Sequence, residues 1–341
     1  MLKPSASRKA PHRSPSPQKT ARHSSTTVEV VHPLWLLKAF ALSLLVALLC
    51  AWLTVCLLFY QGEWQLVLHS SRSIAQTPTA LNLPYDPIRF DVAETGQPRL
   101  TGWWLPASPA SAAASGPALT TPPRYASFTI LYLHGGSGSL SDTLPALARL
   151  HSAGLNIFAI DYRGFGASDP THPTESRMAQ DTAAALDYLA GTRHIPARSI
   201  IPYGEGLGAS LAAALAQKHP ELPAVILSNP IPDPAAIAAA ARPTRLIPVR
   251  LLLRDRFDIA TALTTLTTPK LLIADEPEPS SQNPHDPSGL RATETLFQHA
   301  ASPSYSVTLT AANYDADLQT ALTRFLDEYL PATPTTLPPI P

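Results

Sequence analysis

The stretch from Ile200 to Ser210, which reads I-I-P-Y-G-E-G-L-G-A-S, constrains the fold of this chain more than any other. An apolar strand leads into the turn, and an Ala- and Leu-rich helix follows it. This order is typical of a nucleophile elbow, a sharp strand-to-helix turn whose flanking glycines make room for one raised side chain. Gly204 and Gly208 take the flanking positions, and the raised position holds Gly206, which has no side chain. The pattern therefore predicts the turn without the attacking atom.

Shifting this pattern by one residue does not supply the attacking atom. Glu205 would then occupy the raised position, but Tyr203 and Leu207 would stand where small residues are needed. Ser210 lies one turn further along the expected helix, away from the apex. We therefore keep Gly206 as the apex of the turn.

The charge balance and the cysteines exclude several classes of protein. Lys and Arg together number 25, as do Asp and Glu, so nucleic acid is not expected as a partner. Cys50 and Cys56 lie in one apolar run, where neither a disulfide framework nor a zinc site is expected. No metal and no other cofactor is predicted.

The N-terminal region indicates a membrane anchor. Residues 1–33 are basic and rich in Ser and Pro, which is typical of a disordered tail. We predict a transmembrane anchor over residues 34–60, because the run from Ala39 to Tyr60 is apolar and uncharged. As a helix, its roughly 22 residues span roughly 33 Å, enough to cross a bilayer. A cleaved signal peptide is the competing interpretation, but the run is too long and no small-x-small cleavage site follows it.

The charges around this run predict its orientation. Basic residues precede it, whereas the acidic Glu63 follows it. The positive-inside rule then places the N-terminus in the cytoplasm and the rest of the chain outside it, in the periplasm if the host is bacterial.

The remainder of the chain alternates between strand and helix patterns, which predicts an α/β fold with a mostly parallel sheet covered by helices on both faces. We expect one domain over residues 61–330, with a cap insertion at about 231–266, an irregular linker at 106–123 and a Pro-rich tail at 331–341. The expected strands are 87–92, 99–105, 127–133, 155–160, 199–201, 224–227, 270–274 and 305–310. The expected helices are 144–153, 175–190, the helix after the elbow, 290–300 and 315–329.

Five motifs occur in an order that resembles a known family. They are Gly102-Trp-Trp-Leu-Pro-Ala, His134-Gly-Gly-Ser-Gly, Asp161-Tyr-Arg-Gly-Phe-Gly-Ala-Ser, the elbow, and Leu253-Arg-Asp-Arg-Phe-Asp. From about Gln61 to Pro331, the chain resembles membrane-anchored α/β-hydrolase-domain proteins of the serine-aminopeptidase-like superfamily. The resemblance implies the α/β-hydrolase fold and an ancestral ester, thioester or amide hydrolase chemistry.

The resemblance also implies where the catalytic groups should be. The two oxyanion donors would be the backbone N–H groups of Gly136 and Leu207. The acid position falls on Glu278, with Asp275 as the alternative, but we favour the interpretation that this segment is a solvated acidic loop. The base position falls on Asn313 or Tyr314, and a neutral amide cannot accept a proton near pH 7.

The sequence therefore supports three hypotheses. The first is a membrane-tethered pseudoenzyme without serine-hydrolase turnover, which serves as a scaffold or as a binding domain for a small acyl or lipid-like ligand. The second is an active hydrolase that uses Ser137 or Ser210 with His134 or His285. The third is a module that binds a protein partner.

The cap insertion carries five arginines: Arg242, Arg245, Arg250, Arg254 and Arg256. They indicate either a basic rim for a carboxylate, a phosphate or lipid headgroups, or a solvated helix face with a salt bridge such as Arg254 to Asp258. We favour the second interpretation.

Overall fold

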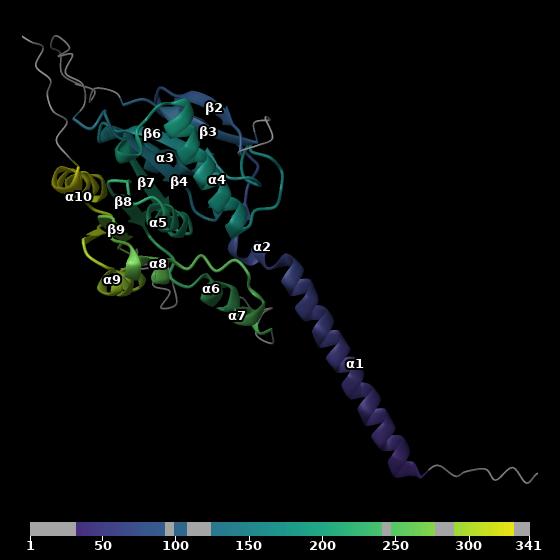
Figure 1. The fold of residues 1–341 in the computed structure, drawn as a ribbon. Coiled ribbons are helices and arrows are strands. Elements are labelled where there is room, and N and C mark those ends of the chain that lie inside the picture. The colour runs from purple at the N-terminus through teal and green to yellow at the C-terminus, as the bar shows by residue number, and fades with distance from the viewer. Residues whose placement is uncertain (1–31, 93–98, 108–123, 241–246, 277–289, 331–341) are drawn as a thin grey trace, which may run out of the picture. The chain divides into compact units, whose positions relative to one another are not determined.

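The computed structural model describes residues 32–92, 99–107, 124–240, 247–276 and 290–330 (Figure 1). The tail before residue 32, most of the linker, the residues after 330 and the predicted site residues Glu278 and His285 lie outside these ranges. The chain divides into two compact units, Met1–Leu53 and Thr54–Pro341.

One long apolar helix, α1 (Pro33–Gly62), begins in the first unit and ends in the second. Its mean hydropathy reaches 2.7 over 18 residues, and by length and composition it is sufficient to cross a membrane. At 30 residues, α1 is longer than most helices of soluble domains.

The second unit is built on an eight-stranded sheet with the order β10-β9-β8-β7-β4-β6-β3-β2. All neighbouring strands are parallel except β3, which pairs antiparallel with both β2 and β6. The strands are β2 (Asp86–Phe90), β3 (Leu100–Leu105), β4 (Thr129–Leu133), β6 (Asn156–Asp161), β7 (Ile200–Glu205), β8 (Val225–Ser228), β9 (Lys270–Asp275) and β10 (Ser304–Leu309). The predicted mostly parallel sheet is confirmed.

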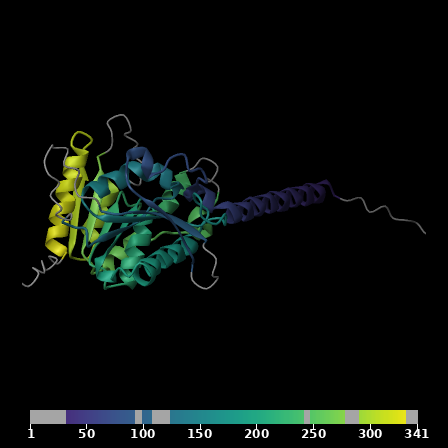
Figure 2. The same cartoon turned by 90° about the horizontal axis from the view of Figure 1, so that it is seen from above.

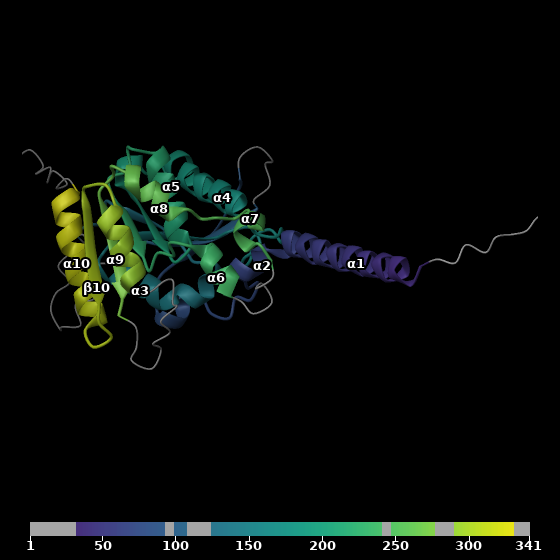
Figure 3. The same ribbon diagram turned by 90° about the horizontal axis from the view of Figure 1, so that it is seen from below.

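The helices cover both faces of the sheet (Figures 1 and 3). One apolar core lies between the sheet and α3 (Leu144–Ser152) and α10 (Tyr314–Tyr329). The other lies under α4 (Glu175–Asp187), α5 (Gly208–Lys218), α8 (Ile259–Thr265) and α9 (Leu290–His299). Figure 2 shows the yellow helix α10 beside the last strands at the sheet edge. The central strands are buried on both faces, which explains their continuous apolar sequences.

Short elements complete this unit. α2 (Trp64–Val67) and β1 (His69–Ser70) follow α1, and β1 pairs in parallel with β5 (Ser137–Gly138). Within the expected cap, the structure describes α6 (Pro234–Ala240), α7 (Val249–Leu252) and α8. Single turns occur at Pro78–Leu81, Leu140–Thr143, Tyr188–Thr192 and Ala197–Ser199.

Candidate functional site

The elbow connects β7 to α5, and its two flanking glycines are required by close packing. A Cβ on Gly204 would lie 2.3 Å from the carbonyl oxygen of Gly208. A Cβ on Gly208 would lie 2.2 Å from the carbonyl oxygen of Leu133 in β4. Both contacts are with backbone atoms, which cannot rotate away, so only glycine fits at either position.

Gly206 lies between these two glycines in a different environment. Its φ of +57° is in the left-handed region, and its N–H donates to the carbonyl oxygen of Ser228 at 2.9 Å. A Cβ here would meet only Gly135 Cα at 3.8 Å and Ile231 Cδ1 at 3.9 Å. The apex therefore has room for a side chain, although the backbone angle favours glycine.

A cavity of about 310 Å³ lies over the elbow. Its apolar lining comes from Leu66, Val67, Leu207 and Ile231, and the rest comes from His69, Gly135, Gly136, Ser137, Glu205, Gly206 and Asn229. Both predicted oxyanion residues thus line it. A Cβ on Gly136 would lie 2.5 Å from Leu207 Cδ1, so these two segments are in close contact. Apolar walls with a few convergent polar groups are typical of a small-molecule site.

Glu205 is held from below the elbow. The phenol of Tyr132, which is fully buried in β4, donates to Oε2 of Glu205. Tyr132 stacks on Tyr203 with ring centroids 5.3 Å apart. Burial and the neighbouring carboxylate raise the pKa of Tyr132, so the phenol stays protonated and remains a donor. Tyr132 in the sheet thereby fixes the position of the Glu205 carboxylate beside the cavity.

Asp275, one of the two predicted acid residues, is the last residue of β9 and hydrogen-bonds to the side chain of Asn229. Asn229 Nδ2 donates to Oδ2 of Asp275 at 2.8 Å, and the Asp275 N–H donates to Oδ1 of Asn229 at 2.9 Å. Oδ1 of Asp275 is buried and has no hydrogen-bond partner among the described residues. Asp275 is thus held by Asn229, and the phenol of Tyr314 lies close enough for the Asp275 carboxylate to raise its pKa. The preferred candidate Glu278 lies outside the described residues.

The predicted base position carries an asparagine and a tyrosine. Asn313 is exposed, and Tyr314 begins α10 beside it. Burial raises the pKa of Tyr314, and the charges of Asp275 and Glu205 raise it further. A phenol with a raised pKa cannot accept a proton near neutral pH. Tyr314, rather than Asn313, is the residue that lies near both carboxylates.

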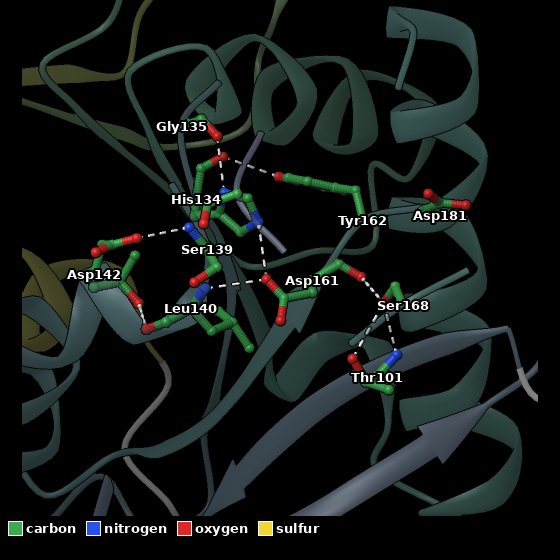
Figure 4. A network of polar contacts seen from close by, with 12 residues as sticks. Thr101, His134, Gly135, Ser139, Leu140, Asp142, Asp161, Tyr162, Ser168 and Asp181 are labelled. Carbon is green, nitrogen blue, oxygen red and sulfur yellow. Dashed lines mark hydrogen bonds and ion pairs between the residues drawn. The ribbon is translucent and has the colours of Figure 1, made fainter. Parts of the chain in front are cut away.

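The side chain of His134 is directed toward Asp161 in the protein interior (Figure 4). It is fully buried, its Nδ1 lies 2.8 Å from the Gly135 carbonyl oxygen, and its Nε2 lies 3.7 Å from Oδ1 of Asp161. Burial lowers the pKa of His134 to about 4 and raises the pKa of Asp161 to about 7. The imidazole is therefore neutral at neutral pH, so this contact is not an ion pair. His134 does not line the cavity, which is against the predicted Ser137–His134 pair.

Asp161 instead connects the two loops that frame the site. Its Oδ1 accepts from the Leu140 N–H at 3.0 Å, and its carbonyl oxygen accepts from the Ser168 hydroxyl at 2.6 Å. In the loop that follows Asp161, Arg163 Nε donates to Oδ1 of the buried Asp181 at 2.6 Å. The conspicuous His-Gly-Gly and Asp-Tyr-Arg-Gly motifs are thus joined through structural hydrogen bonds.

The second predicted nucleophile is also engaged elsewhere. Ser210 is only 5% exposed, and its hydroxyl donates to the carbonyl oxygen of Phe257 at 2.9 Å. It ties α5 to the cap and does not line the cavity. His285, its predicted companion, lies outside the described residues.

The segment that follows α1 lines the cavity, although no sequence pattern predicted that it would. The His69 N–H donates to the Gly136 carbonyl oxygen at 2.7 Å, and the Ser71 N–H donates to that of Gly138 at 2.8 Å. β1 pairs His69 with Ser137 in register, and both residues line the cavity. A two-residue strand carries no periodic pattern, so only a histidine close to the apolar run could have drawn attention to this segment.

The predicted salt bridge from Arg254 to Asp258 is wrong. Arg254 Nε and the Arg254 N–H each donate to Glu63 at 2.7 Å, while Asp258 accepts from the Thr261 N–H and caps α8. Because the carboxylate of Glu63 is buried, leaving it without a cation would cost more free energy than leaving the exposed carboxylate of Asp258 unpaired. Arg250 pairs with Asp233 at 2.7 Å, and Arg242 and Arg245 lie outside the described residues.

The profile of the alpha/beta hydrolase fold family matches residues 129–338. The match covers more than half of the chain, and the sheet order and the elbow agree with it. The chain belongs to the alpha/beta hydrolase fold family.

Two named proteins are similar to part of this sequence. The protein Rv2307c of Mycobacterium tuberculosis is 32% identical over 176 residues, covering 52% of this chain and 56% of that protein. The alpha/beta hydrolase domain-containing protein WAV2 of Arabidopsis thaliana is 30% identical over 161 residues, covering 47% of each chain. The chain spans about half the length of the curated relatives it matches. The structure is similar to that of the Pyrococcus furiosus esterase Pf2001, with a TM-score of 0.56 and 16% identity over 78% of this chain and 98% of that one. This last likeness shows the fold.

Proposed function

We propose that this chain is a membrane-anchored pseudoenzyme of the α/β-hydrolase family whose cavity binds a small acyl or lipid-like ligand without serine-hydrolase turnover. One observation carries the proposal: the apex of the elbow is Gly206, and the nearest atoms to a Cβ there are 3.8 Å away. Serine-hydrolase chemistry needs an attacking oxygen at that apex and a base to deprotonate it. Gly206 supplies no oxygen, and neither Asn313 nor Tyr314 can act as the base.

The remaining groups favour binding. The amides of Gly136 and Leu207 would donate to the carbonyl oxygen of an acyl group, and the apolar walls would hold its chain. Loss of triad members leaves a residual advantage over water of roughly 10³–10⁴ from such donors and binding alone, far below that of a working hydrolase.

The anchor in this proposal is α1. Its 30 residues and its hydropathy fit a span, and the basic residues before it favour a cytoplasmic N-terminus, with the second unit on the other side. A protein partner for that unit is the third hypothesis from the sequence, and stoichiometric co-purification would support it.

The test is covalent labelling of the purified full chain with a fluorophosphonate, together with displacement of a fluorescent fatty acid. We expect displaceable binding and no labelling. Restoring the chemistry gives the matched comparison: Gly206→Ser with Tyr314→His should label about 100-fold faster than Gly206→Ser with Asn313→His, because a positioned base contributes 10²–10⁴-fold and Asn313 is exposed. Labelling of the unaltered chain would overturn the proposal.

A second candidate function is hydrolysis by Ser137 with His69 as base. The specific observation in its favour is that the two residues are register partners and line the same cavity. In this alternative, Ser137 Oγ attacks the acyl carbon while His69 takes its proton, and the alcohol or amine then leaves with that proton. Water, deprotonated by His69, next attacks the acyl-Ser137 ester and releases the acid, and His69 returns the proton to Ser137. Labelling that is lost in Ser137→Ala and in His69→Ala, but retained in the control Ser152→Ala, would establish it.

A further inference from the structure

The segment that follows the apolar helix forms one wall of the cavity. Leu66 and Val67 in α2 and His69 in β1 all line it. The same segment hydrogen-bonds to the loop that carries Gly136, through the His69 N–H at 2.7 Å. The ligand site is therefore completed by residues that directly follow α1.

An ionic contact between the buried Glu63 and the exposed Arg254 holds this segment against the cap. Glu63 is 1% exposed and accepts two hydrogen bonds from Arg254, each of 2.7 Å. The guanidinium of Arg254 also lies 4.5 Å from the ring centroid of Tyr60. Charge-assisted bonds to a buried carboxylate are strong and directional, so this contact fixes where α1 ends relative to the cavity wall.

The covalent chain limits how far the cavity lies from the end of α1. Leu66 lies four positions after Gly62, so the two are at most about 14 Å apart even when the chain is fully extended. A 30-residue helix is about 45 Å long, which matches a bilayer with its headgroup regions. If α1 spans the membrane, its end lies at the headgroup boundary and the cavity wall lies within about 14 Å of it.

We propose that the cavity takes the acyl chain of a lipid that enters from the adjoining membrane leaflet, with residues 63–71 as the access wall. This inference rests on the proposed function and names its ligand class. The carbonyl oxygen of the acyl group faces the amides of Gly136 and Leu207, and its chain contacts Leu66, Val67 and Ile231. A volume of about 310 Å³ is at the lower end for ligand pockets, which suits part of one chain and not a whole two-chain lipid.

The experiment uses the full chain in lipid nanodiscs with two photoactivatable probes. One is a long-chain fatty acid carried in the bilayer, and the other is a water-soluble short-chain acid of the same head chemistry. We expect the bilayer probe to crosslink to peptides that contain residues 64–69, 207 or 231, as mapped by mass spectrometry.

Matched variants test the access wall. Leu66→Trp should lower crosslinking of the bilayer probe about tenfold, whereas Ile74→Trp, at a surface position 42% exposed, should leave it within about twofold. Arg254→Gln, which removes the guanidinium bond to Glu63 and leaves the backbone N–H bond, should lower it about fivefold. The control Arg250→Gln, which breaks only the surface pair with Asp233, should not. If Arg254→Gln fails to fold, the Leu66 pair still decides.

The outcomes separate this inference from the proposed function. Cavity crosslinking by the soluble probe alone overturns the membrane route and leaves the acyl site standing. Cavity crosslinking by neither probe overturns both. Bilayer-probe crosslinks confined to α1, or an unchanged yield in Leu66→Trp, also overturn the access wall.

Discussion

Three glycines stand in one five-residue turn, and they are there for opposite physical reasons. At Gly204 and Gly208, an added Cβ would lie 2.3 and 2.2 Å from backbone oxygens. At Gly206, the nearest atom would lie 3.8 Å away. Packing requires the first two glycines, but it does not require the third.

This difference separates the frame of the site from its chemistry. The frame consists of the close-packed turn, the Asp161 hydrogen bonds and the Arg163–Asp181 pair, and each of these depends on backbone or buried contacts. The chemical positions, at Gly206 and in the Asn313–Tyr314 loop, could carry catalytic side chains without disturbing that frame. The fold of the α/β-hydrolase family is therefore kept, while the predicted chemical positions carry glycine, asparagine and tyrosine.

The largest expected effect comes from Gly208→Ala, which breaks the frame. The new methyl group would overlap the Leu133 carbonyl oxygen and force β7 and α5 apart from β4. We expect a loss of about 4 kcal/mol or more in the free energy of unfolding, since only severe backbone or core defects reach this size. Thermal unfolding of the full chain in detergent measures it, and near-normal stability would contradict the packing argument.

An intermediate effect, dependent on pH, is expected for Asp161→Asn. The pKa of Asp161 is raised from 3.8 to about 7, so the folded chain holds a proton that the unfolded chain releases above about pH 4. This contribution to stability is fully present below pH 4 and is lost as the pH rises through 7. Asparagine does not titrate, so the stability of the variant relative to the unaltered chain should increase by about 2–4 kcal/mol between pH 4 and pH 8.

Unfolding midpoints of both proteins across that pH range provide the measurement. A difference that stays constant with pH would show that Asp161 does not titrate in this window. His134 is present in both proteins, so its own lowered pKa cancels to first order in the comparison.

The smallest expected effect comes from Gly206→Ala, the counterpart of Gly208→Ala at the apex. The methyl group has room, so the cost is limited to a left-handed backbone angle for a residue with a Cβ, about 1–2 kcal/mol. Unfolding midpoints of the two alanine variants, measured side by side, should differ clearly. Equal destabilisation would remove the distinction between apex and frame.

Most of the fold can be predicted from the amino-acid sequence. Apolar strand patterns, helix periodicity and the glycine-rich turns predicted the eight strands of the large sheet and its mostly parallel order, because these signals act over a few neighbouring residues. It also placed Gly206 between its flanking glycines. The apolar run 39–60 likewise predicted the long helix that α1 forms.

Which side chains meet could not be predicted from the sequence. His134 was a candidate base in the sequence, but it is buried beside Asp161. His69, which no pattern indicated, lines the cavity because it lies in a two-residue strand beside Ser137. Arg254 bonds with Glu63, 191 positions away along the chain, and not with Asp258 nearby. Such pairings depend on burial and on long-range approach of separate segments, which no local pattern of residues encodes.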